Sequence, residues 1–179
     1  FMNRFPLCID LNGKPVYLIG EGEQIRQKAE KMTPFCADLI CRDAFTEADA
    51  ENAPAMVIGG DTPRAEAERI FKLCCEYRIP VNVVDVPELC SFYFPALITR
   101  GNLTISVSTA GSSPMAAAHL RQKIEDMLPD NTEQILCWLS EHRSELNEKR
   151  LLKAATVAAF FLGRPLTDDE AGQLTVNFL

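Results

Sequence analysis

Short apolar runs alternate with polar, helix-like stretches over the first two thirds of the chain. The apolar runs, which have the length of buried β-strands, cover residues 15–20, 38–42, 55–59 and 81–84. Residues 23–32 and 63–77 lie between such runs and have the polarity and apolar spacing of helices. Strands separated by helices require right-handed crossovers, so this pattern predicts a parallel sheet.

The pattern changes near the middle of the chain. Residues 96–99 and 103–107 flank Arg100-Gly101-Asn102 and predict a β-hairpin. Helices are predicted after it at residues 114–128, 133–146 and 148–161, and a short one begins at the capping box of residues 167–170. We therefore predict an α/β fold, with a Rossmann-like, mostly parallel sheet in residues 1–112 and an all-helical C-terminal extension in residues 113–179.

Composition and charge narrow the function classes. The 179 residues suffice for one α/β domain with an appendage, and the net charge of −7 argues against nucleic acid. The sequence has no run of 18 apolar residues that would indicate a membrane span, and no signal-peptide core is visible. We therefore expect a cytoplasmic protein. Seven cysteines without a C-x-x-C pair are typical of small buried side chains in a reducing compartment.

A glycine loop follows the first predicted strand. In Gly20-Glu21-Gly22 the first glycine allows a tight turn and the second lets the backbone approach a diphosphate at a helix N-terminus, as in NAD(P) sites. The third glycine position is Ile25, and Glu21 adds negative charge, so a plain strand-to-helix turn explains the loop equally well. The full set of candidate cofactor-binding residues is Gly20, Glu21, Gly22, Glu23, Gln24, Asp43, Gly59 and Gly60. Asp43 is placed to bond a ribose, or to be a solvated charge at a strand end.

Asp85 ends the fourth predicted strand. Ligands of open α/β sheets bind beyond the carboxyl ends of the strands, so Asp85 should face the crevice. Walled by Val84, Val86 and Phe92, it is a candidate general base. The alternative is a carboxylate that only caps the next helix.

A hydroxyl-rich stretch, residues 107–114, precedes the first C-terminal helix. Hydroxyls and backbone donors at a helix N-terminus make an anion site, and three cations lie nearby in sequence: Arg100, Arg121 and Lys123. The alternative interpretation is an ordinary helix cap.

Five blocks, in order, resemble the siroheme synthase family. They are residues 5–14 (FPLCIDLNGK), 20–22 (G-x-G), 82–87 (NVVD-x-P), 91–96 (SF-x-x-PA) and 107–114 (VST-x-G-x-SP). The resemblance covers residues 5 to about 128. Its most specific blocks are NVVD-x-P, residues 82–87, and ST-x-G-x-SP, residues 108–114. The methyltransferase domain of longer members has no counterpart in this sequence.

The resemblance implies a dimeric precorrin-2 dehydrogenase of siroheme biosynthesis, an oxidoreductase that uses NAD, which in many members is also a sirohydrochlorin ferrochelatase, a lyase that takes Fe²⁺ as substrate. By resemblance, Asp85 is the catalytic base for both steps and a transient metal ligand. The tetrapyrrole carries eight carboxylates, which fits cationic and donor-rich binding residues. The implied substrate-binding residues are Asn82, Thr109, Gly111, Ser112, Arg100 and Arg121.

The chain also departs from the family. Besides Glu21 and Ile25, about 20 residues, one strand with its crossover, are missing after the first helix. The strand at residues 38–42 should then lie beside the first strand in a sheet shortened by about one strand. Ala118 replaces a common arginine, and His119 after it is either a proton shuttle, a metal ligand or a structural residue. Two alternatives follow: a tetrapyrrole-binding or chelatase-only protein without NAD, or a non-catalytic Rossmann-like dimer.

Overall fold

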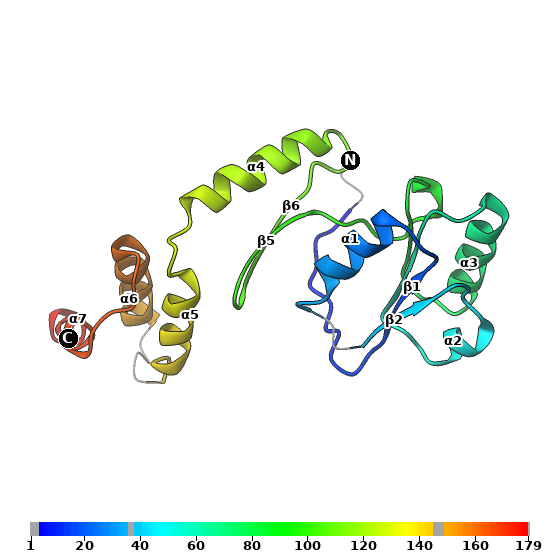
Figure 1. Cartoon of the computed structure of the whole chain (residues 1–179). Helices are drawn as coiled ribbons and strands as arrows, with labels where there is room; N and C mark the ends of the chain where they lie inside the picture. The colour runs from blue at the N-terminus through cyan, green and yellow to red at the C-terminus, as the bar shows by residue number, and fades with distance from the viewer. Residues whose placement is uncertain (1–3, 36–37, 145–148, 179) are drawn as a thin grey trace. The chain divides into compact units, whose positions relative to one another are not determined.

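The computed structural model describes residues 4–35, 38–144 and 149–178. It has two compact units that divide between Phe94 and Pro95, and each is considered by itself. In Figure 1 the first unit runs from blue to green and the second from green to red.

A four-stranded parallel sheet is the centre of the first unit. Its strands are β1 (Val16–Ile19), β2 (Leu39–Arg42), β3 (Met56–Gly59) and β4 (Val81–Val83), in the order β2-β1-β3-β4. Val16 lies opposite Leu39 on one side and Met56 on the other. This confirms the predicted parallel, Rossmann-like sheet, and β2 lies beside β1 as expected.

Helices cover both faces of this sheet, and every residue of β1 and β3 is therefore buried. They are α1 (Glu23–Met32), α2 (Glu47–Glu51) and α3 (Arg64–Glu76), followed by the 3₁₀ turn η1 (Pro87–Leu89). Val16 and Leu18 pack with Ile25 and Met32 of α1, and the alternate residues of β1 pack toward α3. Helix α2 was not predicted; it is one turn long and depends on a capping box between Thr46 and Asp49.

The order of the strands creates a switch point. From β1 the chain first adds β2 on one side and then β3 on the other. The loops that leave the carboxyl ends of β1 and β3 therefore diverge, and this is the place where such sheets bind ligands. Gly20 and Gly60 are the first residues of these two loops.

The second unit begins with a hairpin packed on a helix. Strands β5 (Ala96–Arg100) and β6 (Leu103–Val107) pair antiparallel, and both contact α4 (Pro114–Met127), which Ser113 caps as predicted. The sequence placed the domain boundary at residues 112 and 113, whereas the structure groups the hairpin with the helices. The reason is packing: the hairpin turn lies so close to α5 (Thr132–Glu141) that a Cβ on Gly101 would stand 2.5 Å from Glu133 Cγ.

Three helices complete the second unit: α5, α6 (Lys149–Leu162) and α7 (Asp168–Phe178). Their shared core is Ile135, Trp138, Leu139, Leu151, Ala155, Ala159 and Leu166. The predicted helix over 133–146 ends at Glu141, where His142 is the C-cap: its backbone N–H bonds the carbonyl oxygen of Trp138 and its ring stacks on the Trp138 indole. Residues 145 and 146 lie outside the described ones. The capping box of Thr167 and Glu170 is confirmed.

No helix among the described residues is long and apolar enough to cross a membrane.

The expectation that the cysteines are buried was wrong for Cys8, Cys41, Cys75 and Cys137, which are exposed. Cys74, on the inner face of α3, is buried, and this burial raises the pKa of its thiol to about 12.

Candidate functional site

The glycine loop has the backbone shape that a diphosphate site requires. Gly20 and Gly22 have φ of +90° and +111°, a region that other residues rarely adopt. A Cβ on Gly22 would meet nothing within 4 Å, so its backbone is open to a ligand. No side chain caps the start of α1, which leaves its first backbone N–H groups as anion donors.

Ile25 does not disturb this loop, because Gly60 makes room for it. A Cβ on Gly60 would lie 2.5 Å from Ile25 Cγ1 and 3.2 Å from the carbonyl oxygen of Ile19. The close helix-to-strand approach, which a third loop glycine usually permits, is thus achieved from the β3 side. Ile25 at the third glycine position is therefore compatible with close packing of α1 on the sheet.

One of the two acidic side chains at the loop is paired within α1. Glu21 and Glu23 are both exposed, and Glu23 pairs with Arg26 and accepts a hydrogen bond from Gln27 Nε2 at 3.0 Å within its own helix. Asp43 is exposed and directly follows β2, the strand beside β1. That is the position from which a carboxylate bonds a ribose in dinucleotide-binding sheets.

Thr62 adds a polar group that the sequence did not point out. Its Oγ1 is buried and has no hydrogen-bond partner within the described residues, which is rare for a hydroxyl. Its Cγ2 would lie 3.2 Å from a Cβ on Gly20, so the hydroxyl belongs to the same edge of the sheet. Its position two residues after Gly60 was the only signal available. Loop, Asp43 and Thr62 together fit a bound dinucleotide.

Asp85 lies at this edge in a strained backbone conformation. Its φ is +59°, and hydrogen bonds from Val84 N to Gly59 O (2.9 Å) and from Val86 N to Val83 O (3.3 Å) hold the turn on both sides. Aspartate tolerates this conformation better than most residues, and such strain is often found at functional sites. The side chain is exposed rather than walled in by Val84 and Val86.

Asp85 is joined to the start of α1, directly after the glycine loop, by a hydrogen bond. Gln24 Nε2, on the first turn of α1, donates to Asp85 Oδ2 at 2.8 Å. One turn further, Lys28 is half-buried with its ammonium 4.0 Å from the centre of the Phe94 ring. Burial and then Lys31 lower the pKa of Lys28, while Cys90 and Asp85 act in the opposite direction. Lys28 is a cation near Asp85 that the sequence analysis missed, although its helical spacing from Gln24 was visible.

Asn82, on the strand that precedes the Asp85 turn, helps to hold the segment that follows the turn. It is buried, and its Nδ2 donates to the carbonyl oxygen of Phe92 at 2.9 Å. Cys90 Sγ donates to the carbonyl oxygens of Val83 and Val86 at 3.2 and 3.3 Å. The amide expected to bind substrate therefore has a structural partner, and it ties the two ends of the loop together.

In the second unit, the Thr109 hydroxyl is used inside its own turn. Thr109 Oγ1 donates to Ser113 O at 3.0 Å and accepts from Ser113 N at 3.1 Å. Ala110 and Gly111 both have positive φ, which folds the turn tightly, and Gly111 and Ser112 are exposed. The exposed backbone of this turn, rather than the Thr109 hydroxyl, is what it can offer to a ligand.

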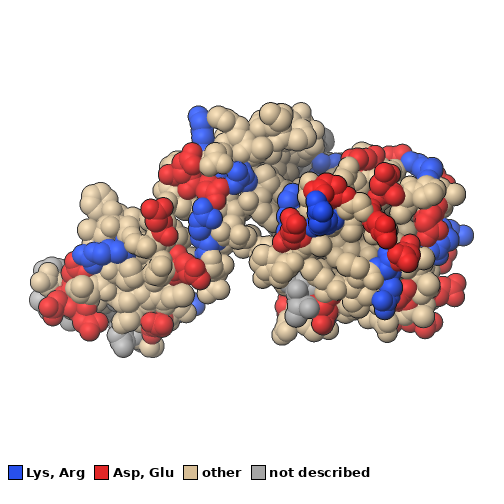
Figure 2. All heavy atoms as spheres, viewed as in Figure 1, with Lys and Arg blue, Asp and Glu red and all other residues tan. Residues whose placement is uncertain are grey.

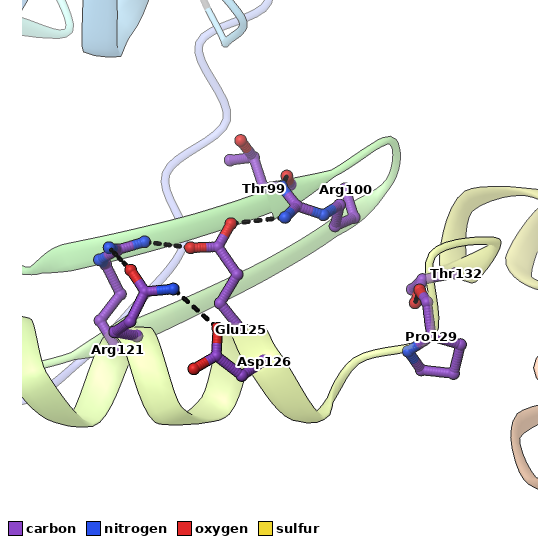
Figure 3. Close-up of polar contacts among 8 residues, drawn as sticks. Thr99, Arg100, Arg121, Glu125, Asp126, Pro129 and Thr132 are labelled. Atoms are coloured by element: carbon purple, nitrogen blue, oxygen red, sulfur yellow. Dashed lines mark hydrogen bonds and ion pairs between the residues drawn. The ribbon is translucent and has the colours of Figure 1, made fainter.

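Arg100 and Arg121 close on one carboxylate, as Figure 3 shows. Arg100 Nη2 lies 2.6 Å from Glu125 Oε1, and Arg121 pairs with Oε2 of the same residue. The sequence predicted both arginines as substrate ligands, whereas the structure uses them to fix the hairpin to α4. The i,i+4 pair of Arg121 and Glu125 was visible in the sequence, but the contact of Arg100 with Glu125 was not, because it forms only through the fold.

The two other polar candidates of the sequence, Lys123 and His119, lie on the surface of the second unit, where both are exposed on α4. Among the described residues, no group of three histidine, cysteine, aspartate or glutamate side chains could hold a metal ion. On the face seen in Figure 2, acidic and basic side chains are interspersed and no large basic surface appears, in keeping with the net charge of −7.

Comparisons with known proteins show which families and folds this chain resembles. Residues 36–96 match the family described as "Putative NAD(P)-binding", and residues 100–127 match "Sirohaem biosynthesis protein central". Siroheme synthase 1 of Klebsiella pneumoniae is 32% identical, over 83% of this chain and 36% of that protein. Siroheme synthase of Thioalkalivibrio sulfidiphilus is 30% identical, over 91% of this chain and 40% of that protein. A solved structure of SirC, a precorrin-2 dehydrogenase, superposes with a TM-score of 0.70 at 15% identity, covering 97% of this chain and 98% of that one.

The matches also show how the length of this chain compares with that of the siroheme synthases. The chain spans well under half the length of the siroheme synthases it matches. The alignment with the Klebsiella protein runs over 169 residues, whereas 83% of the 179 residues here is about 149. About 20 aligned positions therefore have no residue in this chain, a difference of the size expected from the sequence. The SirC likeness supports the fold, a Rossmann-like sheet followed by helices. The chain belongs to the siroheme synthase family, of which it holds the NAD(P)-binding and central segments.

Proposed function

We propose that this chain is an NAD-dependent precorrin-2 dehydrogenase of siroheme biosynthesis. The observation that carries the proposal is the hydrogen bond between Gln24 and Asp85, because it joins the loop suited to a dinucleotide to an exposed carboxylate at the same edge of the sheet. The similarity to siroheme synthases and to the SirC fold supports the choice of substrate.

The residues of the first unit would divide the binding of NAD between them. Backbone N–H groups at Gly22 and the start of α1 would hold the diphosphate, Asp43 a ribose, and the buried Thr62 hydroxyl a further polar group. When bound, NAD⁺ supplies the hydride acceptor.

Asp85 would act as the general base. Conversion of precorrin-2 to sirohydrochlorin removes one hydride and one proton, and the balanced products are sirohydrochlorin, NADH and H⁺. The exposed Asp85 carboxylate would accept this proton, and exposure lets it pass the proton to water afterwards.

The test is to mix the chain with precorrin-2 and NAD⁺ and to follow NADH and sirohydrochlorin by absorbance. We expect the two products in equal amounts. If calorimetry detects no binding of NAD⁺ or NADP⁺, the dehydrogenase function is excluded and a chelatase-only or tetrapyrrole-binding protein remains.

A second activity, sirohydrochlorin ferrochelatase, is favoured by the same exposed Asp85. Insertion of Fe²⁺, the metal substrate, releases two pyrrole protons, which a solvent-accessible carboxylate can accept, and the carboxylate could ligate the incoming metal transiently. Adding sirohydrochlorin with Fe²⁺ or Co²⁺ should shift the absorbance bands. An unchanged spectrum excludes chelation, and the absence of both activities would leave a non-catalytic dimer.

We further propose that the chain forms a homodimer. Large apolar side chains of α6 are exposed, among them Val157 (61%), Phe161 (89%) and Leu162 (47%). An apolar surface of this kind is typical of a protein interface. Light scattering after size exclusion should give twice the chain mass, and a monomer would contradict the proposal.

A further inference from the structure

Gln24 occupies a position where the sequence predicts a cofactor contact, yet its side chain bonds elsewhere. It lies on the first turn of α1, where helix N–H groups face the diphosphate site. Its Nε2 donates instead to Asp85, 61 residues away in the sequence. The neighbouring Gln27 shows the ordinary alternative, because its amide bonds Glu23 within the same helix.

We propose that Gln24 is a positioning residue, which holds the Asp85 carboxylate in the orientation that accepts the substrate proton. The inference rests on the proposed dehydrogenase function and extends it from the base itself to the group that orients the base. It also assigns to the first turn of α1 two tasks: its backbone serves the dinucleotide and one side chain serves the base.

The turn fixes the backbone of Asp85 but leaves its side chain exposed. Hydrogen bonds from Val84 N and Val86 N secure the peptide on either side of the residue. An exposed carboxylate can still rotate about χ1 and χ2, and a misplaced reacting group is costly for catalysis. The 2.8 Å bond from Gln24 restricts this rotation.

A neutral donor suits this task better than a cation. A guanidinium or ammonium in direct contact stabilises the charged form of a carboxylate and makes it a weaker base. The amide of Gln24 binds only Oδ2, and within the described residues no hydrogen bond reaches Oδ1. One oxygen is thus held, while the other has no partner within the described residues and is left for the proton.

The kinetic test compares Gln24→Leu with the matched control Gln27→Leu, on the same helix. We expect kcat for precorrin-2 oxidation to fall about tenfold in Gln24→Leu, while the Kd for NAD⁺ by calorimetry stays within about twofold, a factor worth well under 1 kcal/mol. Gln27→Leu should keep both values. If Gln24 is instead a cofactor ligand, the Kd for NAD⁺ rises and kcat at saturating NAD⁺ is unchanged, which overturns the proposal.

A second readout does not depend on turnover. The side-chain amide signal of Gln24 in a ¹⁵N-resolved NMR spectrum is identified by its loss in Gln24→Leu, and we expect it to move in Asp85→Asn while the Gln27 signal stays. An unmoved Gln24 signal overturns the proposal whatever the activity. An active wild-type enzyme with an unaffected Gln24→Leu also overturns it and leaves the dehydrogenase function standing. An inactive wild-type chain overturns the proposed function, and the proposal with it.

Discussion

Two sets of charged groups were expected to serve the substrate, and the structure treats them differently. Asp85, in the first unit, is exposed and lies in a strained turn, and among the described residues its side chain accepts one hydrogen bond, from the neutral amide of Gln24. Arg100 and Arg121, in the second unit, are both paired with Glu125, which is only 20% exposed as a side chain. We call the exposed carboxylate of Asp85 an open charge and the paired Arg100–Glu125–Arg121 cluster a closed one.

The difference indicates which charges are available for chemistry. A charge neutralised within the chain must lose its partner before it can bind a ligand, and this costs free energy. An exposed carboxylate with a spare oxygen bears no such cost. We therefore propose that the edge of the sheet in the first unit serves catalysis and that the Arg100–Glu125–Arg121 cluster in the second serves stability.

The largest expected effect comes from removing the open charge. Asp85→Asn keeps the shape of the side chain and tolerates the positive φ, so the fold should persist. Without a base, we expect the rate of precorrin-2 oxidation to fall by about 10²- to 10⁴-fold. NADH formation measures this loss, and NAD⁺ calorimetry serves as the control for the fold. Unchanged turnover would remove Asp85 from the mechanism and erase the contrast.

The next effect concerns the close packing that shapes the open edge. Gly60→Ala should lower the free energy of unfolding by about 1–3 kcal/mol, because its Cβ would overlap Ile25. It should also weaken NAD⁺ binding, since α1 is displaced. Urea unfolding and calorimetry measure the two quantities. The double variant Gly60→Ala with Ile25→Ala should regain NAD⁺ affinity; no difference between the single and double variants would show that this contact does not shape the loop.

The closed cluster should respond in stability rather than in substrate affinity. We expect Glu125→Gln and Arg121→Met each to lose about 1 kcal/mol of unfolding free energy, a modest value because these groups are partly exposed. The KM for precorrin-2 should change less than about twofold, well under the tenfold that 1.4 kcal/mol of binding would represent. Lys123→Met, on the exposed side of the same helix, is the control. A large rise in KM at constant stability would return the arginines to the substrate site.

The smallest effect is a pH dependence of a second closed pair. Arg164 and the Thr167 backbone hold the pKa of Glu170 down at about 2. Because the folded pKa lies below the unfolded one, the stabilisation is present above pH 4.5 and is lost as the pH falls toward 2. Helical circular dichroism during acid titration should show a loss in this range that Glu170→Gln lacks. Identical titrations would mean that this pair is not closed in solution.

Local features of this fold followed from the sequence because they depend on neighbouring residues. The strands, the hairpin and the caps at Ser113 and Thr167 all arise from periodicity and turn chemistry. The placement of Gly20 and Asp85 at one edge was also predictable, because the carboxyl ends of parallel strands meet there.

Features that depend on contacts between distant residues were not predictable. The Gln24–Asp85 bond, the space that Gly60 leaves for Ile25 and the position of Glu125 between two arginines all require the tertiary structure. The same is true of the hairpin, which appeared continuous with the sheet in sequence but packs on α4 and α5. Helix α2 escaped because five residues show no clear period.

The central claim is that a dinucleotide site and a working base share one edge of the sheet. Its most direct test is to titrate NAD⁺ into wild-type and Asp85→Asn protein and then add precorrin-2 to each. We predict equal affinity for NAD⁺ in both, with NADH formed about 10²- to 10⁴-fold more slowly by Asp85→Asn than by the wild type. Wild-type protein that binds no NAD⁺, or an Asp85→Asn variant that forms NADH at the wild-type rate, would contradict the account.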